Sequence, residues 1–345
     1  MNKKLLALAV AAALIPAAAM ADSGNVKISG GLHMSVDSLD DGMNRETNIA
    51  SNSSWIKFSG DEALGNGLKA IWQLDTQIGM GNTSNDGNNT WANRNSFIGL
   101  SGNFGTTILG RHDTPLKLVG RKADLFGDQI GDSRNLITVG GIGDLRPDNV
   151  IAYISPTMGG FHGAIAYVTN NDANFTEANS TKATSALGIY ENGPVMLGLG
   201  YEVHNVAGTS ADPKQWRLVG GYNFGDVKLV ALYQKADDLG AVDSADRKVW
   251  GLGAAYKMGA ATIKGQYYNA GDLNSVNNTG AKMYALGVDY SLSKRTTTYV
   301  AYARTNNDDN TQSFTAFGGG HGDNPATAAA GENSTGFSLG MKHSF

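Results

Sequence analysis

Apolar and polar residues alternate with a period of two along most of the chain. Trp216, Leu218 and Tyr222 share one parity, for example, whereas Gln215 and Arg217 take the other. Such alternation is typical of β-strands with one apolar and one polar face. Sixteen runs of this kind are predicted, at 25–37, 53–62, 67–77, 91–101, 105–111, 149–155, 161–169, 184–190, 196–204, 215–224, 227–236, 248–257, 261–269, 281–291, 296–305 and 334–345.

Short and long connections take turns between these runs. The short ones, such as GNFG at 102–105 and NFGD at 223–226, contain the glycine and asparagine that tight turns require. This alternation places all tight turns at one end of a single sheet and all long loops at the other. The long connections are predicted at 38–52, 78–90, 112–148, 170–183, 205–214, 237–247, 270–280 and 306–333.

A sheet of sixteen hairpin-linked strands is too wide to stay open with exposed edges. A soluble sandwich is disfavoured because it would need Greek-key crossings. Closed on itself, a sheet of this width surrounds an aqueous channel, with polar residues facing water and apolar residues facing lipid. The sequence therefore predicts an all-β fold, a 16-stranded antiparallel up-and-down transmembrane β-barrel with short periplasmic turns and long extracellular loops.

The N-terminal residues differ from the rest of the chain. Lys3 and Lys4 precede an apolar run, and Ala19-Met20-Ala21 follows it with small residues at the positions that a signal peptidase requires. A membrane anchor is the alternative, but the run is shorter than the ~20 residues of a spanning helix. We expect residues 1–21 to be a cleaved signal peptide and 22–345 to form the barrel in the outer membrane.

Composition and motifs narrow the possible functions. The chain has no cysteine, which excludes disulfides and thiolate chemistry, and its net charge of −4 is too small to indicate a nucleic-acid partner. Its six histidines are scattered, with neither a zinc-protease motif nor a serine nucleophile elbow nearby. We therefore expect no enzymatic activity, metal or cofactor, although a hydrolase could assemble its residues from separate strands.

Four stretches carry a resemblance to the general diffusion porins of Gram-negative bacteria, most closely the trimeric porins of beta- and gammaproteobacteria. They are SSWIKFSGDEALGNGLKAIWQLD (53–75), RNSFIGLSGNFGTTILGRHDTP (94–115), RPDNVIAYISPTMGGFHGAIAY (146–167) and the C-terminal strand that ends in Phe345. One position departs from the pattern, because Trp55 stands where the family usually has an arginine of the pore wall.

The resemblance implies that the third long loop, 112–148, folds into the barrel and narrows a channel for small hydrophilic solutes and ions. Aspartates and basic residues are nearly balanced in this loop, so we expect opposed charges at the constriction. Arg111 shares its parity with Leu109 and is also compatible with a subunit interface. The loop contains Asp113, Asp124, Asp128, Asp132, Asp144 and Asp148 together with Lys117, Arg121, Lys122, Arg134 and Arg146. The predicted constriction residues are Arg94, Arg134 and Arg146 on the wall, Asp124 and Asp128 on the loop, and Arg111.

The resemblance also implies partners. It predicts a homotrimer embedded in outer-membrane lipid, and a terminal Phe345 that the barrel-assembly machinery recognises. A slight preference for anions is expected because the predicted wall residues are all arginines. Two alternatives remain: a substrate-selective channel, or a surface adhesion barrel with a plugged lumen and 306–333 as its working part.

Overall fold

The computed structural model describes residues 26–81, 91–138, 142–169, 180–206, 209, 211–274, 276–311 and 314–345. The predicted signal peptide, 1–21, lies outside these residues. The described strands are β1 (Lys27–Asp40), β2 (Arg45–Ser51), β3 (Trp55–Gly65), β4 (Leu68–Gln77), β5 (Ser96–Gly102), β6 (Gly105–Arg111), β7 (Val150–Ile154), β8 (Phe161–Val168), β9 (Ser180–Asn192), β10 (Val195–Val206), β11 (Lys214–Phe224), β12 (Val227–Asp237), β13 (Arg247–Met258), β14 (Ala261–Ala270), β15 (Ala281–Ser291), β16 (Thr296–Asn307) and β17 (Ser334–Ser344).

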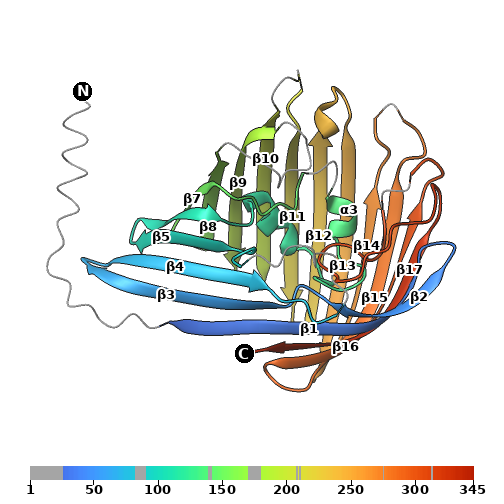
Figure 1. Ribbon diagram of the computed structural model, residues 1–345, viewed down its shortest axis with the longest axis horizontal. Coiled ribbons are helices and arrows are strands. Elements are labelled where there is room, and N and C mark those ends of the chain that lie inside the picture. Colours follow the sequence, from blue (N-terminus) through green and yellow to red (C-terminus); the bar gives the residue numbers. More distant parts are fainter. Residues whose placement is uncertain are drawn as a thin grey trace.

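The strands form one closed antiparallel ring (Figure 1). From β3 onward each strand pairs with the next along the chain, and β17 pairs with β1 from Gly31–Ser344 to Asp40–Thr335. Closure leaves no strand edge without a partner, as a spanning sheet requires in lipid. The predicted up-and-down barrel is therefore confirmed.

The seventeen described strands correspond to sixteen strands of the barrel, because β2 and β3 are two parts of one interrupted strand. Both pair with β1, β2 along its C-terminal half and β3 along its N-terminal half. The interruption falls at Asn52–Ser54, where Ser53 has a φ of 52°. This bulge turns Ser53 out of the regular pleat and into the interior of the barrel.

The prediction of a long loop at 38–52 was wrong. β1 continues to Asp40 and β2 starts at Arg45, so residues 41–44 form a tight turn instead. The Asp41 carboxylate accepts hydrogen bonds from the backbone N–H groups of Met43 and Asn44, which closes the turn. The polar composition of this stretch is typical of a loop, but pairing with β1 outweighs it. The later connections keep the predicted alternation, as between β9 and β10 (193–194) and between β12 and β13 (238–246).

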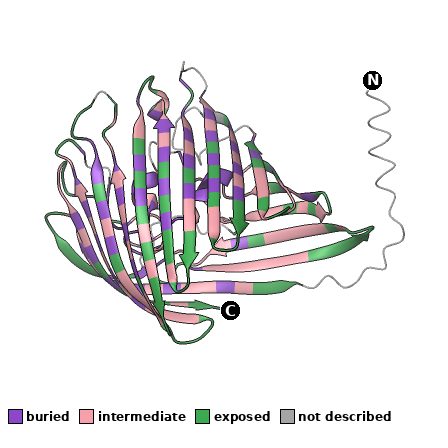
Figure 2. Cartoon of the chain, turned by 180° about the vertical axis from the view of Figure 1, so that it is seen from behind, coloured by how far each residue is buried: buried purple, intermediate pink, exposed green. Residues whose placement is uncertain are grey.

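The two faces of the sheet differ in exposure, and the alternation is visible along the strands in Figure 2. Ile98, Leu252 and Leu286 point outward and are 62%, 56% and 62% exposed. A row of exposed apolar side chains is what a transmembrane barrel presents to hydrocarbon. No helix in the described ranges is long and apolar enough to cross a membrane.

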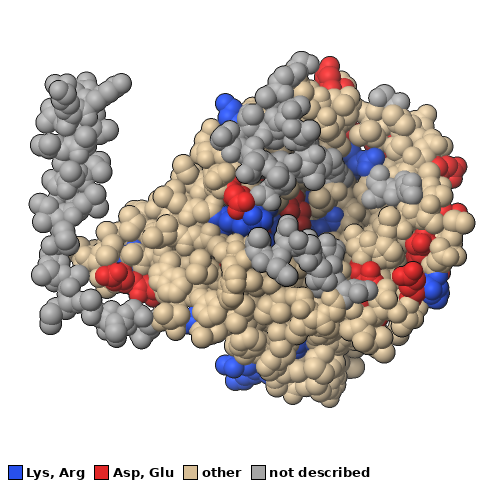
Figure 3. All heavy atoms as spheres, in the orientation of Figure 1, with Lys and Arg blue, Asp and Glu red and all other residues tan. Residues whose placement is uncertain are grey.

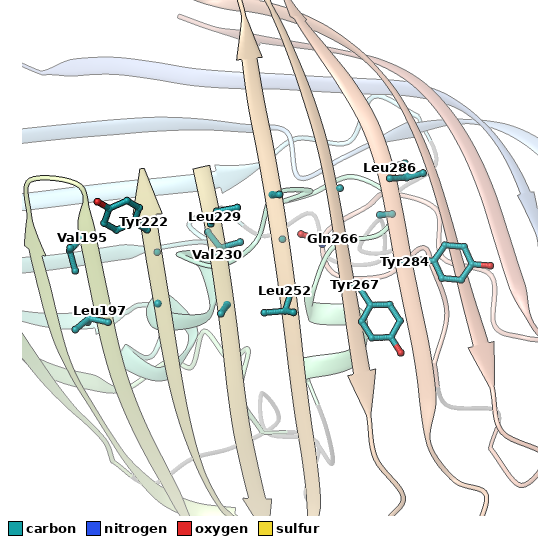
Figure 4. Close-up of a pocket in the computed structure, with 17 residues that line it drawn as sticks. Val195, Leu197, Tyr222, Leu229, Val230, Leu252, Gln266, Tyr267, Tyr284 and Leu286 are labelled. Atoms are coloured by element: carbon teal, nitrogen blue, oxygen red, sulfur yellow. The ribbon is translucent and has the colours of Figure 1, made fainter. Parts of the chain in front are cut away.

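A groove of about 870 Å³ crosses the outer surface of β10–β15 (Figure 4). Its floor includes small residues such as Ala231, Ala254 and Gly265, while leucine and tyrosine side chains form its rims. Because the groove lies on the hydrocarbon-facing side and is almost wholly apolar, it offers no chemistry for a polar solute.

Loop 112–148 folds into the ring, as predicted, and carries two short helices, α2 (Pro115–Arg121) and α3 (Arg134–Ile137) (Figure 1). Val119 and Leu136 belong to a buried cluster with Ile189 of β9 and Val219 of β11. The inner face of the barrel is therefore apolar where it supports the loop, instead of polar throughout. The remaining described helix is the 3₁₀ turn η1 (Leu239–Ala241).

Arg217 of β11 fastens both helices of this loop to the wall. Its guanidinium donates hydrogen bonds to the carbonyl oxygens of Leu116 (3.0 Å) and Ile137 (3.4 Å), and to the side chain of Gln234 (2.9 Å). The side chain is fully buried. Gln234 also donates to the carbonyl of Ile137, at 2.7 Å. Carbonyls without a donor inside a protein are costly, so Arg217 and Gln234 together help to hold the loop in its place in the lumen.

We predict that Arg217→Met destabilises the folded barrel by about 2–4 kcal/mol, because the buried carbonyl of Leu116 and the side-chain oxygen of Gln234 each lose a donor while the apolar stem is retained. Urea-induced unfolding in detergent measures the change. The matched control is Arg45→Met, which removes an exposed ion pair with Asp40 and costs at most about 1 kcal/mol. Equal stability of the two variants would contradict the anchoring role of Arg217.

Candidate pore constriction

A polar cavity of about 380 Å³ lies in the lumen between loop 112–148 and the wall. We call this cavity the eyelet. In Figure 3, basic and acidic side chains gather at the hollow in the middle of the molecule. The eyelet is lined by Ser53, Gln77, Arg94, Asp113, Lys117, Arg121, Asp128, Arg134, Thr138, Asp144, Arg146, Gly319 and Gly320.

Positive charge is in excess around the eyelet. Five basic side chains and three carboxylates line it, which leaves two positive charges more than negative ones. The cavity is narrow, so a passing ion comes close to these groups and interacts with them strongly. The composition of the lining alone therefore favours anions.

Two of the predicted arginines lie on the wall side of the eyelet. Arg94 follows the long loop before β5, and its Nε lies 3.4 Å from a carboxylate oxygen of Asp75 on β4. Arg146, at the end of loop 112–148, lies 2.9 Å from Asp113. Asn95 accepts a hydrogen bond from Arg146 and donates one to Asp113, which holds this pair in place.

Arg134 lies on the loop instead of on the predicted wall. It occupies the first position of α3 and forms ion pairs with Asp128 (2.6 Å) and Asp132 (2.7 Å). Arg121, at the end of α2, contacts the same two carboxylates at 3.1 and 3.4 Å. The loop thus carries its own cluster of opposite charges, and its two arginines line the same cavity as Arg94 and Arg146.

Neighbouring basic side chains keep the carboxylates at the eyelet ionised. Burial alone would raise the pKa of Asp113, but Lys117 and Arg146 outweigh it, so the pKa falls below its usual range. Burial is likewise outweighed at Asp128, whose pKa Arg134 and Arg121 lower. These carboxylates therefore stay ionised well below neutral pH.

Asp132 is fully buried beneath the eyelet, and burial raises the pKa of this carboxyl to about 8. Five N–H groups from Asp128, Arg121 and Arg134 nevertheless donate to its two oxygens. A protonated carboxyl could not accept all of them, so the geometry favours the ionised form. We therefore treat Asp132 as charged.

Two predicted residues do not line the eyelet. Asp124 accepts hydrogen bonds from the backbone of Phe126 and Ser133 and from Gln266 of β14, so it braces the loop against the wall. Arg111 forms an ion pair with Asp148 at 2.7 Å. It shares the parity of Leu109, which is 55% exposed on the outer surface.

The sequence prediction missed four charged lining residues, Asp113, Lys117, Arg121 and Asp144. A signal for three of them exists, because Asp113, Lys117 and Arg121 are spaced four residues apart and so share one face of α2 and its approach. Asp113 and Lys117 form an ion pair at 3.0 Å. Ser53, Gly319 and Gly320 carry no such signal, since they reach the eyelet through a strand bulge and through a second loop that folds inward.

Trp55, which replaces the arginine typical of the family, stands opposite Gln77 in the β3–β4 pairing. Because Gln77 lines the eyelet, Trp55 faces the lumen as well. The ammonium group of Lys57, two residues on and on the same face, lies 5.1 Å from the centre of the Trp55 ring. Lys57 thus retains a positive charge on the lumen-facing side of β3, two residues after the position of the usual arginine.

Comparison with known proteins agrees with this architecture. Residues 7–310 match the family described as Gram-negative porin. The chain is 34% identical over 252 residues to outer membrane porin protein 32 of Delftia acidovorans, covering 68% of this chain and 70% of that protein. It is 36% identical over 182 residues to the major outer membrane protein P.IB of Neisseria gonorrhoeae, spanning half of each chain.

A solved structure, an anion-selective porin from Comamonas acidovorans, superposes with a TM-score of 0.76 at 28% identity, covering 94% of this chain and all of that one. Family, relatives and barrel agree on an integral outer-membrane channel for passive diffusion, as predicted from the sequence. The chain belongs to the Gram-negative porin family.

Proposed function

We propose that this porin passes small hydrophilic solutes and ions and prefers anions to cations at the eyelet. The observation that carries the proposal is the excess of five basic over three acidic side chains around the cavity. The likeness to the Comamonas acidovorans protein, which is an anion-selective porin, gives further support. No covalent chemistry is part of this function.

Each group at the eyelet has a proposed role. Arg94 and Arg146 attract anions from the wall, and Arg121 and Arg134 do so from the loop. Asp128 holds the two loop arginines in place and weakens their field. The predicted transverse field between wall arginines and loop carboxylates is therefore revised, since Arg134 stands on the loop and positive charge lies on both sides.

Export and assembly complete the proposal. Residues 1–21 direct the chain out of the cytoplasm and are removed, and the barrel inserts into outer-membrane lipid as a homotrimer. The Arg111–Asp148 pair supports the trimer, because it lies on the outer parity, where a charged pair suits a subunit interface better than lipid. An adhesin built on 306–333 is disfavoured, because Phe317 and Gly320 of that loop pack inside the ring.

Removing wall charge will reduce the anion preference. At about 4 Å a unit charge contributes about 1 kcal/mol even in water, or roughly fivefold in ion preference per charge. We expect the double variant Arg94→Gln/Arg146→Gln to lose most of the anion selectivity, and Asp113→Asn to increase it. The reversal potential across a planar bilayer in a salt gradient measures both effects.

Arg45→Gln is the matched control for these variants, because Arg45 is also an arginine paired with an aspartate but does not line the eyelet. Its reversal potential should equal that of the wild type. If Arg94→Gln/Arg146→Gln also leaves the reversal potential unchanged, the eyelet is not the selectivity filter.

The anion preference should not change between about pH 9 and about pH 6. The lowered pKa values of Asp113 and Asp128 keep them ionised in this window, and burial is outweighed at Arg134, whose pKa the neighbouring carboxylates raise. The reversal potential as a function of pH tests this. A rise in anion preference as the pH falls would instead show that Asp132 takes up a proton.

Phe345 closes the sheet and is proposed as the assembly signal. Its backbone exchanges hydrogen bonds with Gly30, and its ring fills the space above that glycine. We expect deletion of Phe345 to reduce the amount of barrel in the outer membrane more than it alters the conductance of channels that do form. Phe345→Ser, which keeps the backbone bonds, separates recognition of the ring from strand closure; normal membrane levels of both variants would contradict the proposal.

A further inference from the structure

Lysines stand at the long-loop end of the outer barrel surface, each in the same position relative to an aromatic residue. Lys248 lies two residues from Trp250 on β13, and Lys282 lies two residues from Tyr284 on β15, so each shares the outer face with its aromatic neighbour. The same spacing recurs on two more strands, in Lys214–Trp216 of β11 and Lys235–Tyr233 of β12. On all four strands the lysine is the residue nearer to the long loops.

The aromatic residues fix the depth of these lysines in the membrane. The ring centres of Trp216 and Tyr233 lie 5.3 Å apart, and those of Trp250 and Tyr267 lie 5.4 Å apart, so the rings form a belt across neighbouring strands. Tryptophan and tyrosine prefer the boundary between hydrocarbon and headgroups. A strand advances about 3.4 Å per residue, so the lysines stand about 7 Å beyond the belt, at the level of the headgroups.

Two of the four lysines have carboxylate partners and two do not. Lys214 and Lys235 form ion pairs with aspartates at and just after the end of β12. Lys248 and Lys282 are exposed, and neither forms an ion pair with a residue that the structure describes. Asp272, in the loop before β15, accepts hydrogen bonds from backbone N–H groups of its own loop. Two lysines at the headgroup level are therefore available to an external anion.

The outer groove of β10–β15 lies on the membrane side of these two lysines. Leu252 lines it four residues from Lys248 along β13, and Leu286 lines it four residues from Lys282 along β15. Figure 4 shows both leucines along the groove, with Tyr284 at one end. An apolar groove of about 870 Å³ at this depth suits a hydrocarbon chain. Positive charge and an apolar groove thus occur together, in the order of a lipid headgroup and its chains.

The groove faces away from the proposed subunit contact. In the ring of sixteen strands, β13 follows β6 by seven strands, which is nearly half of the circumference. The Arg111–Asp148 pair, at the end of β6, therefore lies on the opposite side of the barrel. Lipid, and not another copy of this chain, is the neighbour that fits the groove.

We propose that the outer surface of β11–β16 binds a phosphorylated lipid of the outer leaflet. Lys248 and Lys282 contact the phosphate groups of its headgroup, and an acyl chain lies in the groove below them. Arg304 of β16 stands opposite Tyr284 on the same face and adds a third positive charge. The charges select an anionic headgroup, and the groove selects a lipid over a free phosphate ion.

Native mass spectrometry of the purified porin in detergent tests this site, with diphosphoryl lipid A as the added probe. We expect Lys248→Gln/Lys282→Gln to weaken binding of lipid A roughly tenfold or more, because each cation near a membrane surface contributes about fivefold in affinity. The matched control is Lys228→Gln/Lys257→Gln, which removes two exposed lysines from the short-turn ends of β12 and β13 and should bind as the wild type does. Equal binding by the two double variants would overturn the headgroup site.

A second pair of variants tests the groove without changing any charge. Ala254→Leu fills the groove from its floor and should weaken binding of lipid A several-fold. Its control is Ala186→Leu on β9, which stands opposite the exposed Ile165 and Tyr201 but lies outside the groove and should leave binding unchanged. Wild-type binding by Ala254→Leu, or displacement of lipid A by millimolar inorganic phosphate, would show that no acyl chain occupies the groove and would overturn the proposal.

Discussion

Every backbone N–H and C=O group of a spanning sheet needs a partner within the sheet, because hydrocarbon offers none. Pairing β17 with β1 meets this requirement by closing the ring. A closed barrel of sixteen strands has an interior that the side chains of its wall alone do not fill. Two loops occupy that space, and the eyelet is the gap that remains between them and the wall.

The charged side chains inside the barrel are also paired with one another. The constriction loop brings its carboxylates and arginines together in a buried network, so each charge has a partner when a solute is absent. Such a network is rigid and strongly charged at once. It presents guanidinium groups to the lumen without the reorganisation that free side chains would need. Selectivity thus arises from a fixed arrangement of charge and not from flexible side chains.

The barrel could be predicted from the sequence, because lipid on one face and water on the other impose an apolar–polar period of two on every strand. It also located the constriction loop and placed Arg94, Arg146 and Asp128 around one cavity. It failed where tertiary pairing outweighs composition, as in the tight turn at 41–44. Arg134 lines the same cavity, but the sequence placed it on the wall instead of on the short helix α3, since parity on a strand says nothing about a helix.

The closing pair of strands comes from opposite ends of the chain, and this separation affects how the barrel folds. Contacts this distant in sequence carry a high entropic cost and form late. Until β17 has been synthesised and exported, β1 keeps an open edge that could pair with another chain. A chain truncated near its C-terminus would therefore be more than an unstable porin: it would be a sheet with two free edges, prone to add strands from its neighbours.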